Sequence, residues 1–419
     1  MFVRRFLLSI LAFLISFAPS AGTAADAEWT GWLGPNRDGW VADYTPPAKW
    51  PAELHRLWQV EVGDGYGSPL VHQGRVFLHT RQGDNEVVRC LDLDSGKEIW
   101  RQDNAVSFKI GGGGERHGKG PKSCPVLADG RLFTLSIVGT LRAWDASSGK
   151  RLWSRDFREH FPVTQPYWGV STSPIVAQDR VIIHVGNDEK GLLLALDTAT
   201  GQEVWRQGND GTSYSSPLIA SFGDVTQVVE WNHRALVGVD LETGKLLWEV
   251  SFPHEGNNQN MPTPTVHGAQ ILVGGENRGI HSFQPSRSAD GIWSVQDQWH
   301  QPKLALDMST AVINDGMLYG FSHYNSGQLF CLDPISGAIV WQGPGRAGQN
   351  AMFLAVPGYV LALMDRGELK VLAANGANTK IVKTYRVAET PTWAPPVLLQ
   401  NGLLIKDREK LCRWSFDTP

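Results

Sequence analysis

The feature that most constrains the fold of this chain is a short motif repeated five times with fixed internal spacing. In each copy a glycine follows an aspartate by four residues, and a tryptophan follows the same aspartate by eight. The five tryptophans are Trp100, Trp153, Trp205, Trp248 and Trp341. An alternating apolar run precedes each aspartate, which indicates a strand, and the next strand carries the tryptophan. Each copy is therefore expected to form a β-hairpin with an aromatic anchor on its last strand.

The turn chemistry of the motif supports a hairpin. An aspartate carboxylate can accept backbone N–H bonds at the start of a turn, and glycine adopts backbone angles that other residues avoid. The residue two positions before each aspartate is always small: Cys90, Ala143, Ala195, Gly238 or Cys331. We interpret this as a close contact between packed sheets, which gives the two cysteines a packing role.

A second element before each hairpin completes a four-stranded unit. It is a short strand that opens with a small residue and a proline, followed by a tight turn and another strand, as in residues 68–78. Proline is tolerated there because it begins the strand. The units recur at intervals of roughly 42 to 56 residues, a period typical of the blades of a β-propeller.

Three weaker copies bring the count of blades to eight: residues 278–284, 353–372 and 393–414. The last copy reaches the end of the chain before its fourth strand. Residues 57–62 resemble that missing strand, and pairing them with the C-terminal blade would close the ring and hide both sheet edges. The sequence thus predicts an all-β, eight-bladed propeller of four-stranded antiparallel blades, with seven blades as the alternative. The expected divisions are a signal peptide (1–25), an arm that packs on the ring (26–56) and one propeller domain (57–419).

The N-terminus indicates export. Arg4 and Arg5 precede an apolar segment, residues 6–18, that is too short to cross a bilayer as a helix, and small residues follow it. We expect an exported protein of the periplasm or the cell exterior, monomeric and without a membrane span. The formal net charge is −4. Since a nucleic-acid groove needs a basic field, no nucleic-acid partner is expected.

The stretch from Ala195 to Trp205 resembles the tryptophan-docking repeat of the quinoprotein dehydrogenases, which use pyrroloquinoline quinone. It is equally similar to the propeller subunit of the bacterial outer-membrane β-barrel assembly machinery. Residues 32–39 look like the N-terminal arm of exported quinoprotein-like propellers of unassigned function. Together these resemblances cover nearly all of the mature chain and imply a propeller. They say little about activity, because one fold hosts many functions.

The chemistry of the dehydrogenase family does not carry over to this chain. Those enzymes place a disulfide of adjacent cysteines over the quinone and hold calcium through carboxylate and amide side chains. Here the four cysteines, Cys90, Cys124, Cys331 and Cys412, are far apart, and no carboxylate aligns with the family's positions. The assembly subunit is normally lipid-anchored through an N-terminal cysteine, which is absent here. We therefore predict no catalytic residue, no metal site and no cofactor.

The loops that lead into the innermost strands are expected to crowd one end of the central channel, and they are rich in polar and aromatic residues. Convergent polar groups at a concave end are typical of a binding site. The candidate ligand-binding residues are Glu115, Arg116, His117, Tyr167, Trp168, Tyr214, Asn260, Asp307 and Asn350. The alternative is that these groups only fill and hydrate the channel mouth.

Two other patterns are given structural interpretations. Residues 113–120 nearly match a phosphate-binding loop, but Gly120 stands where serine or threonine would be needed, so nucleotide binding is not expected. His79 and His184 occupy the same place in the second strand of their blades, which indicates a structural role.

The expected function is non-enzymatic: an exported scaffold that binds a protein, a peptide or a small ligand at the channel face, with a role in envelope protein assembly. The alternative is an oxidoreductase that uses the same face with pyrroloquinoline quinone and calcium, or a divergent oxidoreductase.

Overall fold

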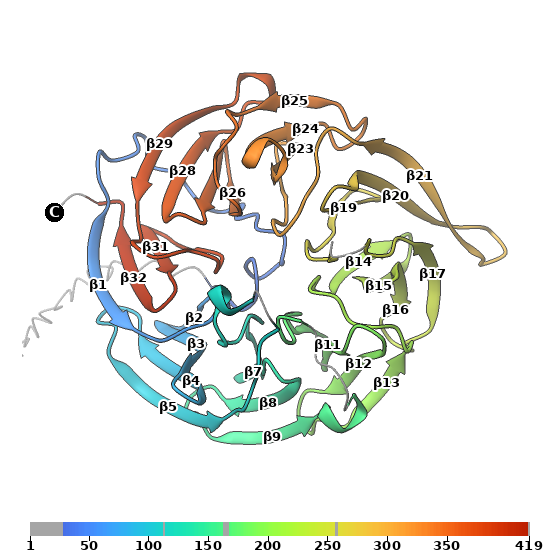
Figure 1. The fold of residues 1–419 in the computed structure, drawn as a ribbon, viewed down its shortest axis with the longest axis horizontal. Helices are drawn as coiled ribbons and strands as arrows, with labels where there is room; N and C mark the ends of the chain where they lie inside the picture. The colour runs from blue at the N-terminus through green and yellow to red at the C-terminus, as the bar shows by residue number, and fades with distance from the viewer. Residues whose placement is uncertain (1–27, 112–113, 162–166, 256–258, 418–419) are drawn as a thin grey trace, which may run out of the picture.

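The computed structural model describes residues 28–111, 114–161, 167–255 and 259–417, which form a ring of eight sheets around a central channel (Figure 1). Each sheet has four antiparallel strands, and the ring confirms the predicted eight-bladed propeller. The predicted signal peptide lies outside the described residues and stays a prediction.

The blades follow one another around the ring in sequence order, each running from an innermost to an outermost strand. The strands of blades one to four are β2 (Leu70–His72), β3 (Arg75–Gln82), β4 (Asn85–Asp92), β5 (Glu98–Ala105); β6 (Val126–Ala128), β7 (Arg131–Leu135), β8 (Thr140–Asp145), β9 (Arg151–Asp156); β10 (Ile175–Ala177), β11 (Arg180–Gly186), β12 (Gly191–Asp197), β13 (Glu203–Gln207); and β14 (Leu218–Phe222), β15 (Val225–Trp231), β16 (Ala235–Asp240), β17 (Leu246–Ser251).

The other four blades repeat this order. Their strands are β18 (Thr265–His267), β19 (Gln270–Gly275), β20 (Gly279–Arg287), β21 (Trp293–Gln301); β22 (Val312–Asn314), β23 (Met317–Ser322), β24 (Gln328–Leu332), β25 (Ile339–Gln342); β26 (Ala351–Val356), β27 (Tyr359–Met364), β28 (Glu368–Ala373), β29 (Lys380–Arg386); and β30 (Val397–Leu399), β31 (Gly402–Lys406), β32 (Lys410–Ser415) with β1 (His55–Glu61).

The eighth blade combines the two ends of the propeller sequence. Strand β1 pairs antiparallel with β32, and the register runs from His55 opposite Ser415 to Glu61 opposite Lys410. Strand β1 is therefore the outermost strand of the last blade although it comes first in the chain. This pairing gives β32 a partner on both sides, so the last blade has four strands like the others.

Indoles on outermost strands join neighbouring blades. In five blades the indole N–H donates, over 2.9–3.1 Å, to the carbonyl that follows the turn aspartate of the next blade. The donor and acceptor pairs are Trp58 with Leu93, Trp100 with Ala146, Trp153 with Thr198, Trp205 with Leu241 and Trp299 with Pro334. The indole also covers the turn glycine: a Cβ on Gly244, whose φ is +71°, would lie 2.7 Å from Cδ2 of Trp205. The motif residues therefore act between blades as well as within a turn.

The small residue before each aspartate lies opposite the tryptophan of its own blade. Cys90 pairs with Trp100, Ala195 with Trp205 and Gly238 with Trp248. A Cβ on Gly238 would lie 2.1 Å from the Trp248 ring, which explains why large side chains are absent there. All four cysteines are buried free thiols, and burial raises the pKa of Cys90 to about 12.

The fifth blade departs from the regular spacing. Its hairpin β20–β21 is longer than the others and extends outward from the ring (Figure 1). The insertion carries Trp299 beyond the spacing of the motif, so the sequence pattern did not identify it. Trp248, which faces this blade, donates to Gln227 of its own blade over 2.7 Å, because no standard turn follows it.

A belt of hydrogen bonds joins the innermost parts of blades one to six. In the first five blades, the small residue before the first strand donates its backbone N–H to the side chain of the equivalent residue in the next blade. The successive members are Ser68, Cys124, Ser173, Ser216, Thr263 and Thr310, at donor–acceptor distances of 2.9–3.1 Å. The recurring small residue of the sequence pattern is thus a link between blades.

The segment before β1 lies across one end of the channel. Trp29 bridges to Val71, and Trp40 to Ala355. The Arg37 guanidinium donates to three carbonyls, those of Ser173, Pro174 and Pro217, over 2.8–3.3 Å. These are carbonyls of the third and fourth blades, so the arm is tied to the inner strands.

Helical structure in the described part of the chain consists of single 3-10 turns. They are η1 (Glu115–His117), η2 (Arg158–His160), η3 (Tyr324–Ser326) and η4 (Gly376–Asn378). Within those residues, no helix has the length and apolar character needed to cross a membrane.

Candidate functional site

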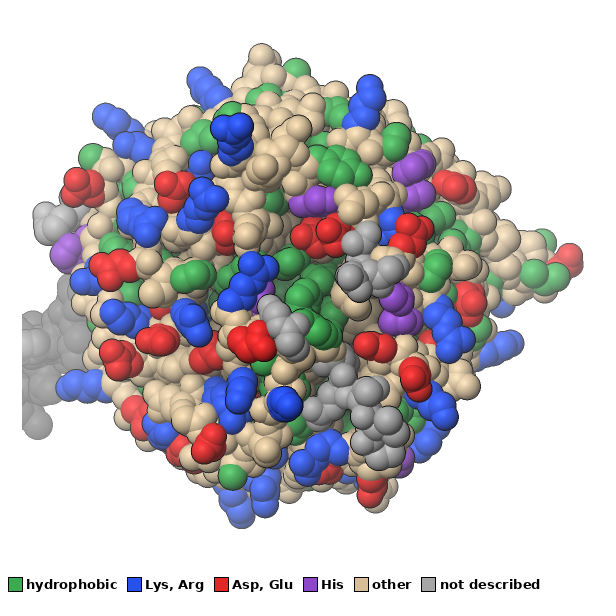
Figure 2. All heavy atoms as spheres, viewed as in Figure 1, with side chains coloured by type: hydrophobic (Ala, Val, Ile, Leu, Met, Phe, Trp, Pro, Cys, Tyr) green, Lys and Arg blue, Asp and Glu red, His purple; other side chains and the backbone are tan. Residues whose placement is uncertain are grey.

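The two ends of the channel differ because the four strands of each blade alternate in direction. Loops from an outermost strand to the next innermost strand emerge on one face, here called the mouth face, together with the loops between second and third strands. The remaining turns lie on the opposite face, where residues 30–38 of the arm line a cavity of about 750 Å³. Figure 2 shows a hollow at the centre of the ring with hydrophobic side chains inside it.

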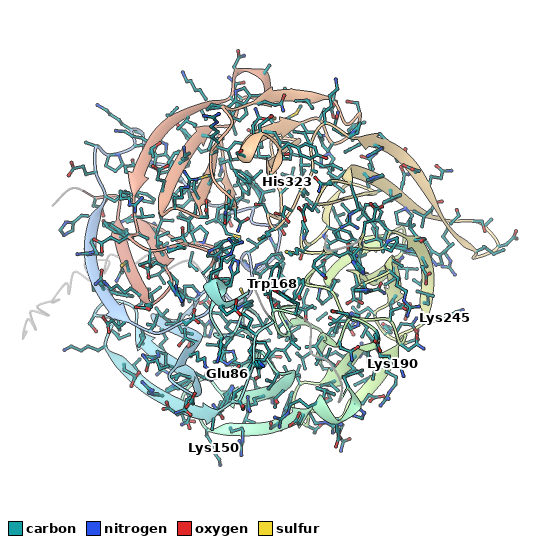
Figure 3. The ribbon with its side chains drawn as sticks, viewed as in Figure 1. Glu86, Lys150, Trp168, Lys190, Lys245 and His323 are labelled. Carbon is teal, nitrogen blue, oxygen red and sulfur yellow. The ribbon has the colours of Figure 1, made fainter. Side chains whose placement is uncertain are left out.

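A second cavity, of about 150 Å³, lies at the mouth face. We call it the mouth cavity. Its lining is aromatic, thioether and hydroxyl in character, with one lysine, one histidine and one asparagine. The larger side chains are Trp32, Tyr66, His117, Lys122, Trp168, Tyr214, Met261, Met308, Asn350, Met352 and Trp393. Trp32 belongs to the arm, so the cavity and the arm share a wall. Trp168 lies near the centre of the ring in Figure 3.

Five rings form a continuous wall. Tyr66 stacks on Trp393 with centroids 5.6 Å apart, and His117 meets Trp393 edge-on at 5.0 Å. Trp168 lies 5.8 Å from His117 and 5.4 Å from Tyr214. The five residues come from loops that lead into five different blades, and their mutual packing fixes the shape of the cavity.

His117 is held neutral by its surroundings. Its Nε2 accepts a hydrogen bond from Arg116 Nε over 3.0 Å, so Nδ1 carries the proton and faces the Tyr66 hydroxyl at 2.9 Å. Burial, and then the cations Arg116, Lys122 and Arg408, lower the pKa of His117 to about 4. Both ring nitrogens are engaged, so this imidazole positions Tyr66 and is poorly placed to act as a general base.

Lys122 brings a cation to the cavity. Its Nζ lies 4.9 Å from the centre of the Tyr66 ring and donates to the carbonyls of His117 and Gly118, each over 3.3 Å. Burial lowers the pKa of Lys122 to about 8, and the more distant Asp64 carboxylate partly offsets this effect.

The structure brings four of the nine predicted ligand-binding residues to this cavity: His117, Trp168, Tyr214 and Asn350. Tyr167 lies at the rim, 39% exposed, with its ring 5.5 Å from that of Trp168.

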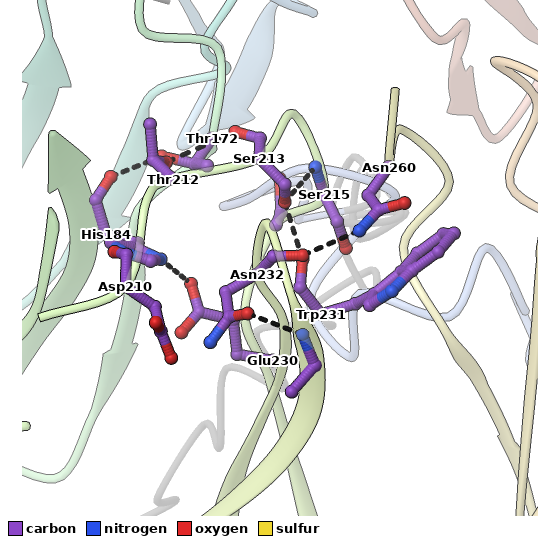
Figure 4. Close-up of polar contacts among 12 residues, drawn as sticks. Thr172, His184, Asp210, Thr212, Ser213, Ser215, Glu230, Trp231, Asn232 and Asn260 are labelled. Carbon is purple, nitrogen blue, oxygen red and sulfur yellow. Dashed lines mark hydrogen bonds and ion pairs between the residues drawn. The ribbon is translucent and has the colours of Figure 1, made fainter. Parts of the chain in front are cut away.

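Four predicted residues lie outside the lining. Arg116 supports His117, as described above, and Glu115 precedes it in the exposed part of η1. Asn260 is buried and donates to the carbonyl of Asn232 over 2.7 Å, within the polar network of Figure 4. Asp307 does not line the cavity, and burial, with a contribution from Glu276, raises its pKa to about 7.

The sequence analysis missed Tyr66 and Trp393, and it did not single out Lys122 or the methionines. A signal for most of them was present. In seven of the eight blades, the residue at one repeat position lines the cavity. This position lies two residues before the small residue that precedes the first strand, or two before Pro395 in blade eight, and it holds Tyr66, Lys122, Ser171, Tyr214, Met261, Met308 and Trp393. This one repeat position therefore builds much of the lining.

The paired histidines are structural. The ring of His79 lies 3.4 Å from the carboxylate of Glu86, and both side chains are buried. His184 of the third blade is hydrogen-bonded to Glu230 of the fourth (Figure 4). Burial alone would lower the pKa of His184, but Glu230 outweighs burial and raises it. These pairs connect strands and lie away from the mouth cavity.

The mouth cavity does not fit a calcium-bound quinone. Calcium takes six to eight oxygen ligands, usually including carboxylates, and no aspartate or glutamate lines the cavity. Among the described residues, no group of three or more histidine, cysteine or acidic side chains is arranged to hold a metal. A volume of about 150 Å³ accommodates a single benzene-sized ring, whereas the quinone has three fused rings.

Comparisons with known proteins agree with the fold. The outer membrane protein assembly factor BamB of Moranella endobia is 24% identical over 365 residues, which cover 83% of this chain and 87% of that protein. The crystal structure of BamB from Moraxella catarrhalis superposes with a TM-score of 0.62 at 14% identity, covering 86% of this chain and 99% of that one. The structure of a quinohemoprotein alcohol dehydrogenase from Pseudomonas putida HK5 superposes with a TM-score of 0.69 at 14% identity, covering 93% of this chain and 80% of that one.

Structural likeness at these identities shows the fold alone, and the family is decided by sequence. The family model described as outer membrane protein assembly factor BamB matches residues 83–343. This match extends over more than half of the chain, which therefore belongs to the BamB family.

Proposed function

We propose that this chain is an exported, periplasmic scaffold that binds a protein or peptide partner at its mouth face during the assembly of envelope proteins. The observation that carries the proposal is the family match over residues 83–343, since the relatives that share it are named as outer membrane protein assembly factors. The scaffold does not need a catalytic centre for this role.

The chemistry of the mouth face supports binding. Aromatic side chains are enriched where proteins meet, because they bury a large area at a low cost in conformational entropy. Tyr167 is 39% exposed and backed by Trp168, so it offers a supported aromatic surface at the rim. The quinone alternative is disfavoured by the lack of carboxylates in the cavity lining.

The test is affinity capture from envelope extract with the mature chain and two matched variants. Tyr167→Glu places a charge at the mouth face, whereas Ile335→Glu places one on a turn of the opposite face, where Ile335 is 61% exposed. We expect the native chain and Ile335→Glu to retain the same protein, and Tyr167→Glu to retain much less of it. Equal capture by all three proteins, or no specific capture, would contradict the proposal.

A further inference from the structure

The mouth cavity presents hydrogen-bond donors without matching acceptors. Asn350 is 0% exposed and lines the cavity. Its Oδ1 accepts a bond from Ser309 Oγ over 2.5 Å, but its Nδ2 has no partner in the part of the chain that the structure describes. An unpaired buried amide donor is costly, so a ligand that brings an acceptor to this position would be stabilised.

The cavity also has a lysine ammonium, that of Lys122, which contacts no carboxylate within the described ranges of the chain. The two partners of Lys122 Nζ, the carbonyls of His117 and Gly118, are neutral and 3.3 Å away. Asp64 influences Lys122 only from a greater distance, and one of its oxygens accepts the Gly120 N–H over 3.1 Å. A partly buried cation without a contacting anion favours a negatively charged ligand.

The size and walls of the cavity limit the rest of the ligand. A volume of about 150 Å³ holds a single six-membered ring. The walls are the faces and edges of Tyr66, Trp168, Tyr214 and Trp393, together with methionine thioethers, and these favour a flat apolar body.

From this combination we propose that the mouth cavity is a binding site for a small carboxylate with a single apolar ring, recognised by Lys122 and Asn350 and enclosed by the aromatic wall. The cavity and the rim share Trp168, which lines the cavity and backs Tyr167. The inference does not rest on the proposed function, because a free acid needs no protein partner at the rim.

The probe is phenylacetate, titrated into the mature protein and followed by isothermal calorimetry and by tryptophan fluorescence, since Trp168 and Trp393 line the cavity. A dissociation constant in the millimolar range or tighter is expected for so small a ligand. Phenylacetamide has the same ring without the charge and should bind at least about tenfold more weakly. No binding of phenylacetate, or equal binding of the amide, would overturn the proposal without requiring any variant.

Two lysine variants locate the site. Lys122→Met removes the charge and keeps the length of the side chain, and should weaken phenylacetate binding at least about tenfold. Lys150→Met is the matched control, because Lys150 is exposed on the outer rim, far from Trp168 (Figure 3). Unchanged phenylacetate affinity in a folded Lys122→Met protein, or equal losses of affinity in both variants, would contradict the placement of the ligand at Lys122. If Lys122→Met does not fold, the comparison of phenylacetate with phenylacetamide binding to the native protein tests the proposal.

The pH dependence gives a further readout. The charged and titratable groups near Lys122 are Asp64, Tyr66 and His117, with Arg116 and Arg408 acting on Tyr66 and His117. Lys406 also lies near Asp64, donates to the Gly65 carbonyl and has a pKa that burial lowers to about 8. Burial raises the pKa of Tyr66, and His117 is already neutral, so neither changes charge between about pH 7 and pH 9. Affinity should therefore fall as the pH rises above about 8, where Lys122 loses its proton. Lys406 loses its proton in the same range but does not line the cavity, so its effect on the ligand should be the smaller one. Constant affinity across this range contradicts a role for the ammonium group.

A negative titration would overturn only this inference. The affinity capture described under the proposed function uses a protein partner and rim variants, so its outcome is separate.

Discussion

Replacement of Trp205 by alanine tests the packing between blades most sharply. The indole is 7% exposed, donates to the Leu241 carbonyl over 3.0 Å and covers Gly244 of the next blade. Its removal would leave a gap at the seam between the third and fourth blades and an unpaired carbonyl beside it.

The magnitude follows from the buried area. A buried indole removes roughly 150–250 Å² from water, which at about 25 cal/mol/Å² amounts to about 4–6 kcal/mol as an upper bound. Since alanine keeps part of the contact, we expect Trp205→Ala to lower the free energy of unfolding by about 3–5 kcal/mol. Val204→Ala is the control, because Val204 precedes Trp205 and is 46% exposed, so its loss should cost less than about 0.5 kcal/mol.

The assay is chemical denaturation followed by far-ultraviolet circular dichroism, which does not depend on the deleted fluorophore. A loss below about 1 kcal/mol for Trp205→Ala, or losses of similar size for both variants, would refute the reasoning that indoles hold the blades together.

The remaining predictions concern the channel. Ser216→Ala leaves the buried Ser173 N–H without its 2.9 Å acceptor and should lower the free energy of unfolding by about 1–3 kcal/mol. Ser221→Ala is the control, because Ser221 lies on an exposed strand end and its loss should cost little. Equal losses in the two variants would contradict a stabilising role for the belt of hydrogen bonds. The pKa of His117 is about 4 in the folded protein and about 6.5 in the unfolded chain. Between pH 4 and pH 6.5 the unfolded state therefore binds more protons, so the free energy of unfolding should fall as the pH drops through this range. In His117→Gln that part of the acid sensitivity should vanish, and an unchanged pH profile of unfolding would count against a buried neutral imidazole.

The architecture was predictable because its determinants are local. The spacing of aspartate, glycine and tryptophan encodes one hairpin, and its recurrence encodes the ring. Trp299 escaped detection because the longer β20–β21 hairpin breaks the spacing while leaving the docking geometry intact. The partner of each indole, a carbonyl in the next blade, follows only from closure of the ring.

The candidate site was less predictable because side-chain direction within a loop depends on distant partners. Met261 and Asn260 are neighbours in one loop, yet Met261 lines the mouth cavity and Asn260 turns toward the Asn232 carbonyl. In another loop Met308 lines the mouth cavity, whereas its neighbour Asp307 does not. Loop composition indicated the face on which the polar and aromatic side chains gather, and the position relative to the first strand of each blade indicates which of them line the cavity.

Site-specific photo-cross-linking in intact cells tests the central claim, that the mouth face is where this scaffold meets its partner. A photoreactive phenylalanine at position 167 would replace Tyr167 at the rim, and the same residue at position 335 would replace Ile335 on the opposite face. We predict a discrete adduct with an envelope protein at position 167 and none at position 335. An adduct only at position 335, or none at either position in a protein that is exported and folded, would contradict the account.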